Sequence, residues 1–98
     1  MTITNKKDGG KLTVALEGRL DTITAPQLEE ELRASLDGVT ELELDLAELA
    51  YISSAGLRVL LSAQKTMNKQ GSMVVRNANS DIMDIFEVTG FSDILSIE

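Results

Sequence analysis

Hydrophobic and polar residues alternate in two stretches of the chain, and this two-residue period predicts β-strands. The first stretch runs from Leu12 to Leu16, and the DGG segment ahead of it can turn a hairpin back to TITN near the first residue. The second stretch places leucines at alternate positions with carboxylates between them: Leu42, Glu43, Leu44, Asp45 and Leu46. We therefore expect an antiparallel pair at the start of the chain and a further strand around residue 44.

Three other stretches have the period of an amphipathic helix. The first begins at Thr24, which forms a capping-box pattern with Gln27, and Gly38 can end it. The second begins within SSAG at residues 53–56, carries a leucine stripe and ends at KQG, residues 69–71. The third begins at Asn79 or Ser80 and stops at Gly90.

Two short apolar segments complete the pattern and predict strands, MVVRN at residues 73–77 and DILSI at residues 93–97. The 98 residues leave room for one domain only. The order of elements predicts a single α/β domain over residues 1–98, in which an N-terminal β-hairpin is followed by alternating helices and strands. Its sheet is expected to be open, mixed and mainly parallel.

Charge and composition narrow the functional classes. The net charge of −7 disfavours direct binding to nucleic acid or to an anionic membrane surface. The absence of Cys and His excludes thiol catalysis, Ser-His-Asp catalysis and the usual zinc sites. The first ten residues lack the apolar core of a signal peptide, and no stretch approaches the length of a membrane span. These features predict a soluble, cytoplasmic protein.

The remaining route to catalysis is a pair of carboxylates, for which Asp21, Asp45 and Glu48 are the candidates. A chain with 3% aromatic residues offers little to stack a sugar, and no glycine-rich loop for a nucleotide is present. We therefore predict a protein that is not an enzyme and needs no metal or cofactor. A small enzyme or nucleotide-binding module using Asp21, Asp45 and Ser54 is the alternative from another class.

The segment ISSAGLRVLL, residues 52–61, holds two adjacent serines at a predicted helix start. A serine there can cap the helix by accepting hydrogen bonds from free backbone N–H groups. A phosphate on the same serine would be tolerated locally and would add about −1.5 to −2 charges at pH 7. From the residues alone, capping is the favoured role and a regulatory switch is the alternative.

The stretch VALEGRLDTITAPQLEEEL, followed by LELDLAELAYISSAGLRVLL, resembles the STAS domain family and specifically the bacterial anti-sigma factor antagonists. The telling motifs are GRLD at residues 18–21, and DL at residues 45–46 ahead of SSAG. The resemblance covers essentially the whole chain and is consistent with the predicted element order.

This resemblance implies a partner-switching protein. In its unphosphorylated form the protein is expected to bind an anti-sigma factor of the GHKL serine-kinase type and so to release a sigma factor. The kinase uses ATP to phosphorylate the antagonist, and a PPM-type serine phosphatase reverses the step. The alternative within the family is a STAS partner-binding module of another complex, such as a stressosome-like scaffold or a lipid-transport component. The sigma factor, the upstream signal and the oligomeric state stay open.

The family pattern at the phosphorylation site is Asp-Ser-Ser-Gly, whereas this chain has Ser53, Ser54, Ala55 and Gly56. Aligning on Gly56 makes Ser54 the implied acceptor, with Ser53 as the alternative acceptor in place of the aspartate. The implied partner-binding residues are Asp21, Thr22, Ser53, Ala55, Gly56 and Leu57. Thr22 and Thr24 also have ordinary roles in a turn and a helix cap.

Overall fold

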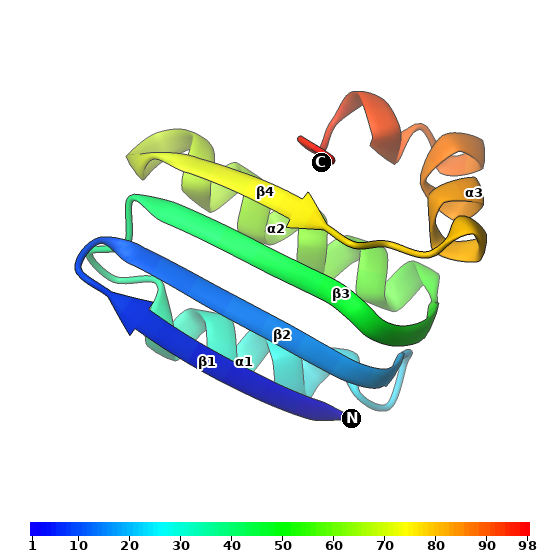
Figure 1. Cartoon of the computed structure of the whole chain (residues 1–98), viewed down its shortest axis with the longest axis horizontal. Coiled ribbons are helices and arrows are strands. Elements are labelled where there is room, and N and C mark those ends of the chain that lie inside the picture. Colours follow the sequence, from blue (N-terminus) through cyan, green and yellow to red (C-terminus); the bar gives the residue numbers. More distant parts are fainter.

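Four strands form one mixed sheet whose spatial order follows the chain (Figure 1). The structure is a computed structural model that describes residues 1–98. The strands are β1 (Thr2–Asp8), β2 (Lys11–Leu20), β3 (Glu41–Ile52) and β4 (Ser72–Arg76). β1 pairs with β2 in antiparallel fashion, and β2, β3 and β4 run parallel to one another. The predicted hairpin and the predicted mixed, mainly parallel sheet are both confirmed.

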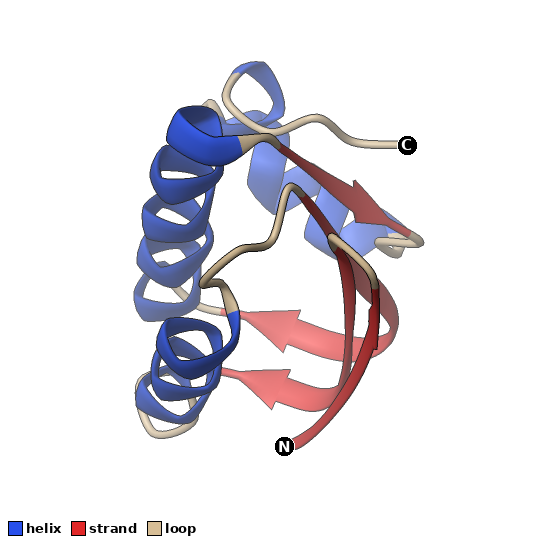
Figure 2. Cartoon of the chain, turned by 90° about the vertical axis from the view of Figure 1, so that its left-hand side faces the viewer, coloured by secondary structure: helices blue, strands red, loops and turns tan.

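Two long helices connect the parallel strands and lie on one face of the sheet (Figure 2). They are α1 (Ala25–Ser35), between β2 and β3, and α2 (Ser54–Gln70), between β3 and β4. Both crossovers fall on the same face because successive parallel strands are added in one direction and such connections are right-handed. A third helix, α3 (Ser80–Thr89), follows β4, and a short 3₁₀ turn, η1 (Phe91–Asp93), follows α3.

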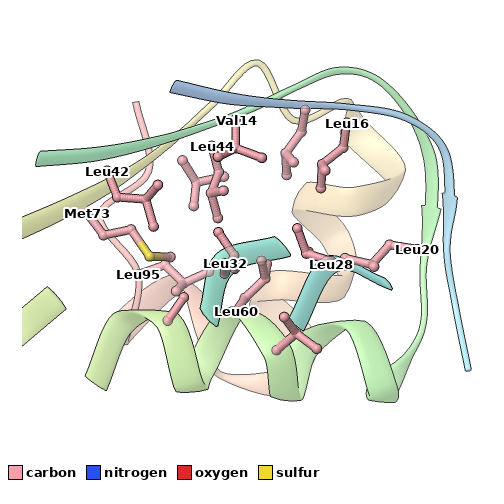
Figure 3. Packing of buried hydrophobic residues seen from close by; sticks show 14 of the residues in the cluster. Val14, Leu16, Leu20, Leu28, Leu32, Leu42, Leu44, Leu60, Met73 and Leu95 are labelled. Atoms are coloured by element: carbon pink, nitrogen blue, oxygen red, sulfur yellow. The ribbon is translucent and has the colours of Figure 1, made fainter. Parts of the chain in front are cut away.

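The core lies between the sheet and these helices, and it is built mainly from leucine (Figure 3). The alternating leucines of β2 and β3 face Leu28 and Leu32 of α1 and Leu60 of α2. Phe86 of α3 is the one aromatic side chain in this buried cluster. Burying an aliphatic side chain of this size contributes about 1.5–3 kcal/mol, so this face anchors every element that carries the site.

β3 is longer than the alternating pattern predicts. Its buried residues follow at spacings of two and then three: Leu42, Leu44, Leu46, Leu49 and Ile52. The change of spacing coincides with two shifts in the register between β2 and β3. Such irregularities insert an extra residue and turn the following side chains. The buried residues in the second half of β3 are therefore three apart, a spacing also found in helices, yet this half still pairs with the end of β2.

The predicted strand at residues 93–97 does not form. The segment begins within η1, and its only pairing is an isolated bridge between Val75 and Ile97. Two backbone bonds make this bridge, from Val75 N–H to Ser96 C=O at 2.8 Å and from Glu98 N–H to Val75 C=O at 2.9 Å. The apolar pattern of DILSI is explained mainly by Leu95, which is buried in the core next to α2 and Met73 (Figure 3).

Candidate functional site

The carboxyl ends of β2 and β3 bring two distant segments of the chain together. Parallel pairing carries on to Leu20 and Ile52, and the backbone N–H of Ser53 then donates to the Leu20 carbonyl at 2.9 Å. The loop of residues 21–24 and the start of α2 therefore lie side by side. This arrangement collects the site residues that the sequence predicts at one edge of the sheet.

The two serines at the start of α2 have different roles. Ser53 is the N-cap, and its Oγ accepts a long hydrogen bond of 3.5 Å from the backbone N–H of Gly56. Ser54 is the first helical residue and is exposed, and its hydroxyl makes no hydrogen bond within the protein. Capping is thus confirmed for Ser53, while the Ser54 hydroxyl is free to react or to contact a partner.

Gly56 and Leu57 are buried in the first turn of α2. A Cβ atom at Gly56 would come within 2.7 Å of Leu20 Cγ and 2.9 Å of Ile52 Cγ1. Only a residue without a Cβ atom fits here, because α2 starts directly against the ends of β2 and β3. Both residues position the start of α2 by packing, and the partner-binding role predicted for them stays a prediction. Ala55 is half-buried and Thr22 is exposed.

The loop of residues 21–24 is organised around the carboxylate of Asp21. Its Oδ1 accepts hydrogen bonds from the backbone N–H groups of Ile23 at 3.0 Å and Thr24 at 3.1 Å, and from the Thr24 hydroxyl at 3.2 Å. The Thr24 N–H, more than any other group, holds the pKa of Asp21 below its ordinary value, and the Arg19 charge acts in the same direction. Asp21 is therefore an anion that fixes the shape of this loop.

Thr24 does not form the predicted capping box, although it is the N-cap residue of α1. Its hydroxyl donates to the Arg19 carbonyl at 2.7 Å and accepts from the Asp21 N–H at 2.9 Å. The side chain therefore turns towards the loop and makes no capping bond to α1. The Gln27 N–H, which a capping box would bind, donates to the Thr24 backbone carbonyl at 3.0 Å instead.

Several residues around this edge were not singled out from the sequence. Ile23 is 87% exposed, so the loop presents a bare aliphatic side chain to solvent. The Arg19 guanidinium lies 4.3 Å from the centre of the Tyr51 ring and 3.7 Å from Asp21 Oδ2. Ile23 could have been noticed as an apolar residue inside a polar turn, whereas the Arg19 contact depends on the parallel register.

A shallow hollow of about 210 Å³ lies between the starts of α1 and α2. Thr22 lines it on one side and Ala55 and Arg58 on the other. The predicted surface residues Thr22 and Ala55 are therefore brought together, with Ser54 beside them in the first turn of α2. The hollow is too open to enclose a small ligand, so this surface is better suited to contact with another protein.

Two of the three carboxylates considered for catalysis, Asp21 and Asp45, accept hydrogen bonds that hold local structure. Asp45 Oδ1 accepts from the Ala47 N–H and from Asn77 Nδ2, both at 3.0 Å, whereas Asp21 is bound within its own loop. Glu48 is exposed. No group of three or more Asp, Glu, His or Cys side chains gathers in the arrangement a metal ion requires. None of the helices has both the length and the apolar character needed to cross a bilayer.

Comparison with known proteins shows similarity along nearly the whole chain. A family model described as Mlab, STAS domain, matches residues 3–96. The BtrV protein of Bordetella bronchiseptica, named as a candidate anti-sigma factor antagonist, is 39% identical over 99% of this chain and 85% of its own length. The anti-sigma-B factor antagonist of Listeria monocytogenes is 33% identical over 95% of this chain and 83% of its own length.

The fold is also similar to that of SpoIIAA of Bacillus, an anti-sigma factor antagonist solved in two states. The unphosphorylated form has a TM-score of 0.79 and covers 99% of this chain and 87% of its own, at 15% identity. The phosphorylated form has a TM-score of 0.77 and covers 99% of this chain and 91% of its own, also at 15% identity. At this identity the likeness establishes the arrangement of helices and strands.

Proposed function

The chain belongs to the STAS domain family, in its group of anti-sigma factor antagonists, and on this premise we propose that it is a partner-switching regulator controlled at Ser54. In the unphosphorylated state it binds an anti-sigma factor and thereby releases a sigma factor. One observation carries the proposal: Ser54 is exposed and has no hydrogen-bond partner, at the edge of the sheet where the 21–24 loop meets α2.

The covalent step takes place on the Ser54 hydroxyl. An anti-sigma factor of the GHKL serine-kinase type transfers the γ-phosphoryl group of ATP to Ser54 Oγ, and the bond from phosphorus to the bridging oxygen breaks. ADP leaves, and the hydroxyl proton is lost to the kinase or to water. A PPM-type phosphatase then hydrolyses the phosphoester and returns the serine and inorganic phosphate. This chain is the substrate and the ligand in the cycle, which runs in the cytoplasm, and it needs no cofactor of its own.

The surface around Ser54 is suited to this role because modification there leaves the fold intact. The first turn of α2 is held by backbone contacts and by Gly56 packing, and the Ser54 side chain takes no part in either. The charge of a phosphate therefore acts on the partner and not on the core. Ile23, Thr22 and Asp21 border the same surface and supply an apolar contact, a hydroxyl and an anion.

Phosphate mapping tests the site directly. The protein is incubated with its cognate anti-sigma kinase and ATP, and the phosphorylated peptide is identified by mass spectrometry. We expect phosphate on Ser54 in the wild type, none in Ser54→Ala, and unchanged phosphorylation in Ser80→Ala, which alters the matching exposed serine of α3. Modification that persists in Ser54→Ala and disappears in Ser53→Ala would contradict the assignment.

Binding measurements test the switch and the identity of the partner. Ser54→Asp should bind the anti-sigma factor at least tenfold more weakly than the wild type, with an unchanged circular dichroism spectrum. A pull-down that recovers a GHKL-type kinase supports the antagonist role. Recovery of a transporter subunit or of a large scaffold in its place would indicate the other kind of STAS module.

A further inference from the structure

Arg58 differs from the other arginines of this chain in having no anionic partner. The others each lie within 4.0 Å of a carboxylate: Arg19 with Asp21, Arg33 with Glu29 and Glu30, and Arg76 with Glu43 and Glu98. Arg58 is exposed on α2 and forms no such pair, although the chain carries a net charge of −7. Its guanidinium therefore presents five N–H donors without an anion to receive them.

The position of Arg58 directs this free cation towards Ser54. The two residues are four apart on α2, so their side chains share one face of the helix and are neighbours on it. Long helical side chains lean towards the N-terminus, which brings the guanidinium of Arg58 over the first turn. Arg58 also lines the hollow with Thr22 and Ala55, and Glu29 on the opposite wall is already paired with Arg33 at 3.1 Å.

The start of α3 provides an internal contrast. Ser80 is also exposed at the first helical residue and follows a capping residue, Asn79. The residue four positions after Ser80 is Asp84, whereas Arg58 is four positions after Ser54. A phosphate on Ser54 therefore faces a free cation, while a phosphate on Ser80 faces a carboxylate. Of these two equivalent serines, only one is placed to hold a phosphate.

We propose that Arg58 couples the phosphorylation state of Ser54 to binding of the anti-sigma factor. This inference rests on the proposed function, in which Ser54 is the acceptor. When Ser54 carries a hydroxyl, the guanidinium is free to bind a carboxylate on the anti-sigma factor. When Ser54 is phosphorylated, its phosphate oxygens accept hydrogen bonds from Arg58 and withdraw it from the partner. Phosphorylation therefore removes an attractive contact at the same time as it adds negative charge.

The first test measures the phosphate itself and needs neither kinase nor partner. Protein carrying phosphoserine at position 54, or at position 80, is prepared by incorporating the modified amino acid during synthesis. The ³¹P resonance is then followed against pH. We expect the phosphate pKa, ordinarily about 6, to be lower at position 54 than at position 80. Arg58→Gln should raise the pKa at position 54 by roughly half a unit, and 1 M salt should reduce this difference.

Lys65→Gln is the matched control, because Lys65 is an exposed, unpaired cation of the same helix that lies about 16 Å from Ser54 along the helix axis. It should leave the phosphate pKa within about 0.1 unit of its starting value. The inference is overturned if Arg58→Gln changes that pKa no more than Lys65→Gln does. Since the phosphate is placed chemically, this result would leave the assignment of Ser54 as the kinase acceptor untouched.

The second test measures binding to the anti-sigma factor by calorimetry. Arg58→Gln should weaken binding of the unphosphorylated protein by roughly fivefold, and phosphorylation should then cause a smaller further loss than in the wild type. Arg58→Lys should restore part of the affinity. An equal loss on phosphorylation in wild type and Arg58→Gln would overturn the role of Arg58. If the proposed function itself is wrong, the result is different: the wild-type protein does not bind the kinase, or the kinase does not modify it on Ser54.

Discussion

The starts of α2 and α3 follow neighbouring parallel strands, yet they are held in different ways. At α3, Asn79 Oδ1 accepts from the Ile82 N–H at 2.9 Å, and Asn79 Nδ2 donates to the Leu49 carbonyl at 3.1 Å. At α2, the side chain of Ser53 makes one capping bond, and this bond is long at 3.5 Å. Side-chain hydrogen bonds hold the start of α3 in place, whereas a backbone hydrogen bond and close packing hold the start of α2.

This difference explains how a modifiable serine can lie at a helix start without weakening the fold. The first turn of α2 is positioned by the bond from Ser53 N–H to the Leu20 carbonyl and by the contact of Gly56 with Leu20 and Ile52. Leu57 adds a buried side chain to this packing, whereas the side chain of Ser54 takes no part in it. Ser54 can therefore change its charge while α2 stays in place, and the effect is transmitted to the partner.

The largest expected effect comes from disturbing the packing that holds α2. Gly56→Ala places a methyl group within 3 Å of Leu20 and Ile52, so one of them must move. We expect the free energy of unfolding to fall by about 1–3 kcal/mol, even though alanine is the better helix former. Urea unfolding followed by circular dichroism measures this change. Ser54→Ala is the control and should stay within about 0.5 kcal/mol of wild type, and equal stabilities of the two variants would contradict the packing argument.

The second-largest expected effect is the loss of stability on removing each capping side chain, which should be larger for Asn79 than for Ser53. Asn79→Ala removes the acceptor for the Ile82 N–H and the donor to the Leu49 carbonyl, so it should cost about 1–2 kcal/mol. Ser53→Ala removes only the long bond to Gly56 and should cost about 0.5 kcal/mol. Both are measured by the same urea unfolding. A larger loss for Ser53→Ala than for Asn79→Ala would reverse the comparison.

The smallest expected effect concerns the pH dependence of the free energy of unfolding. Asp45 contributes to it through its bond to Asn77, which precedes α3. The amide of Asn77, and then the N–H of Ala47, hold the pKa of Asp45 below its ordinary value. Because the folded pKa lies below the unfolded one, the stabilisation is present at neutral pH. It is lost as the pH falls from about 5 through the folded pKa.

Asp45→Asn should therefore lose less stability between pH 7 and pH 3 than wild type does, by under about 1 kcal/mol. Thermal unfolding across this pH range measures the difference, and Asp37→Asn, which removes an exposed loop carboxylate, is its control. An acid dependence that is the same in wild type and Asp45→Asn would show that the Asn77 contact contributes nothing. Asn77 itself has a φ of 64°, a conformation that asparagine tolerates and that this bond helps to hold.

Much of the fold could be predicted because hydrophobic residues recur along most of its strands and helices with the regular spacing of those elements. The alternating leucines of β2 and of the first half of β3 indicate strands, and the leucine repeats of α1 and α2 indicate helices. The prediction of a strand at residues 93–97 was wrong, because that segment has a strand-like pattern but only one bridge to β4. The alternation also did not predict that β3 continues to Ile52, since the spacing of its buried residues changes at the two register shifts against β2.

The candidate site was predicted in part. Ser53, Ser54, Asp21 and Thr22 all lie at one edge, as the motifs indicate, because the carboxyl ends of parallel strands meet there. The burial of Gly56 could not be read from its sequence position, since a small residue suits a close partner and a tight core contact equally well.

By itself, the sequence determined the three helices, the strands up to residue 76, the single α/β domain and the serine pair at a helix start, because these depend on local periodicity and residue chemistry. Only the tertiary structure decided which serine caps and which stays free, and that Arg58 alone among the arginines lacks a carboxylate. The first feature depends on the residue at which α2 begins, which the pairing of β2 with β3 helps to fix through the bond from Ser53 N–H to the Leu20 carbonyl. The second depends on which carboxylates come within reach of each arginine, and for Arg76 this is set by the pairing of β3 with β4.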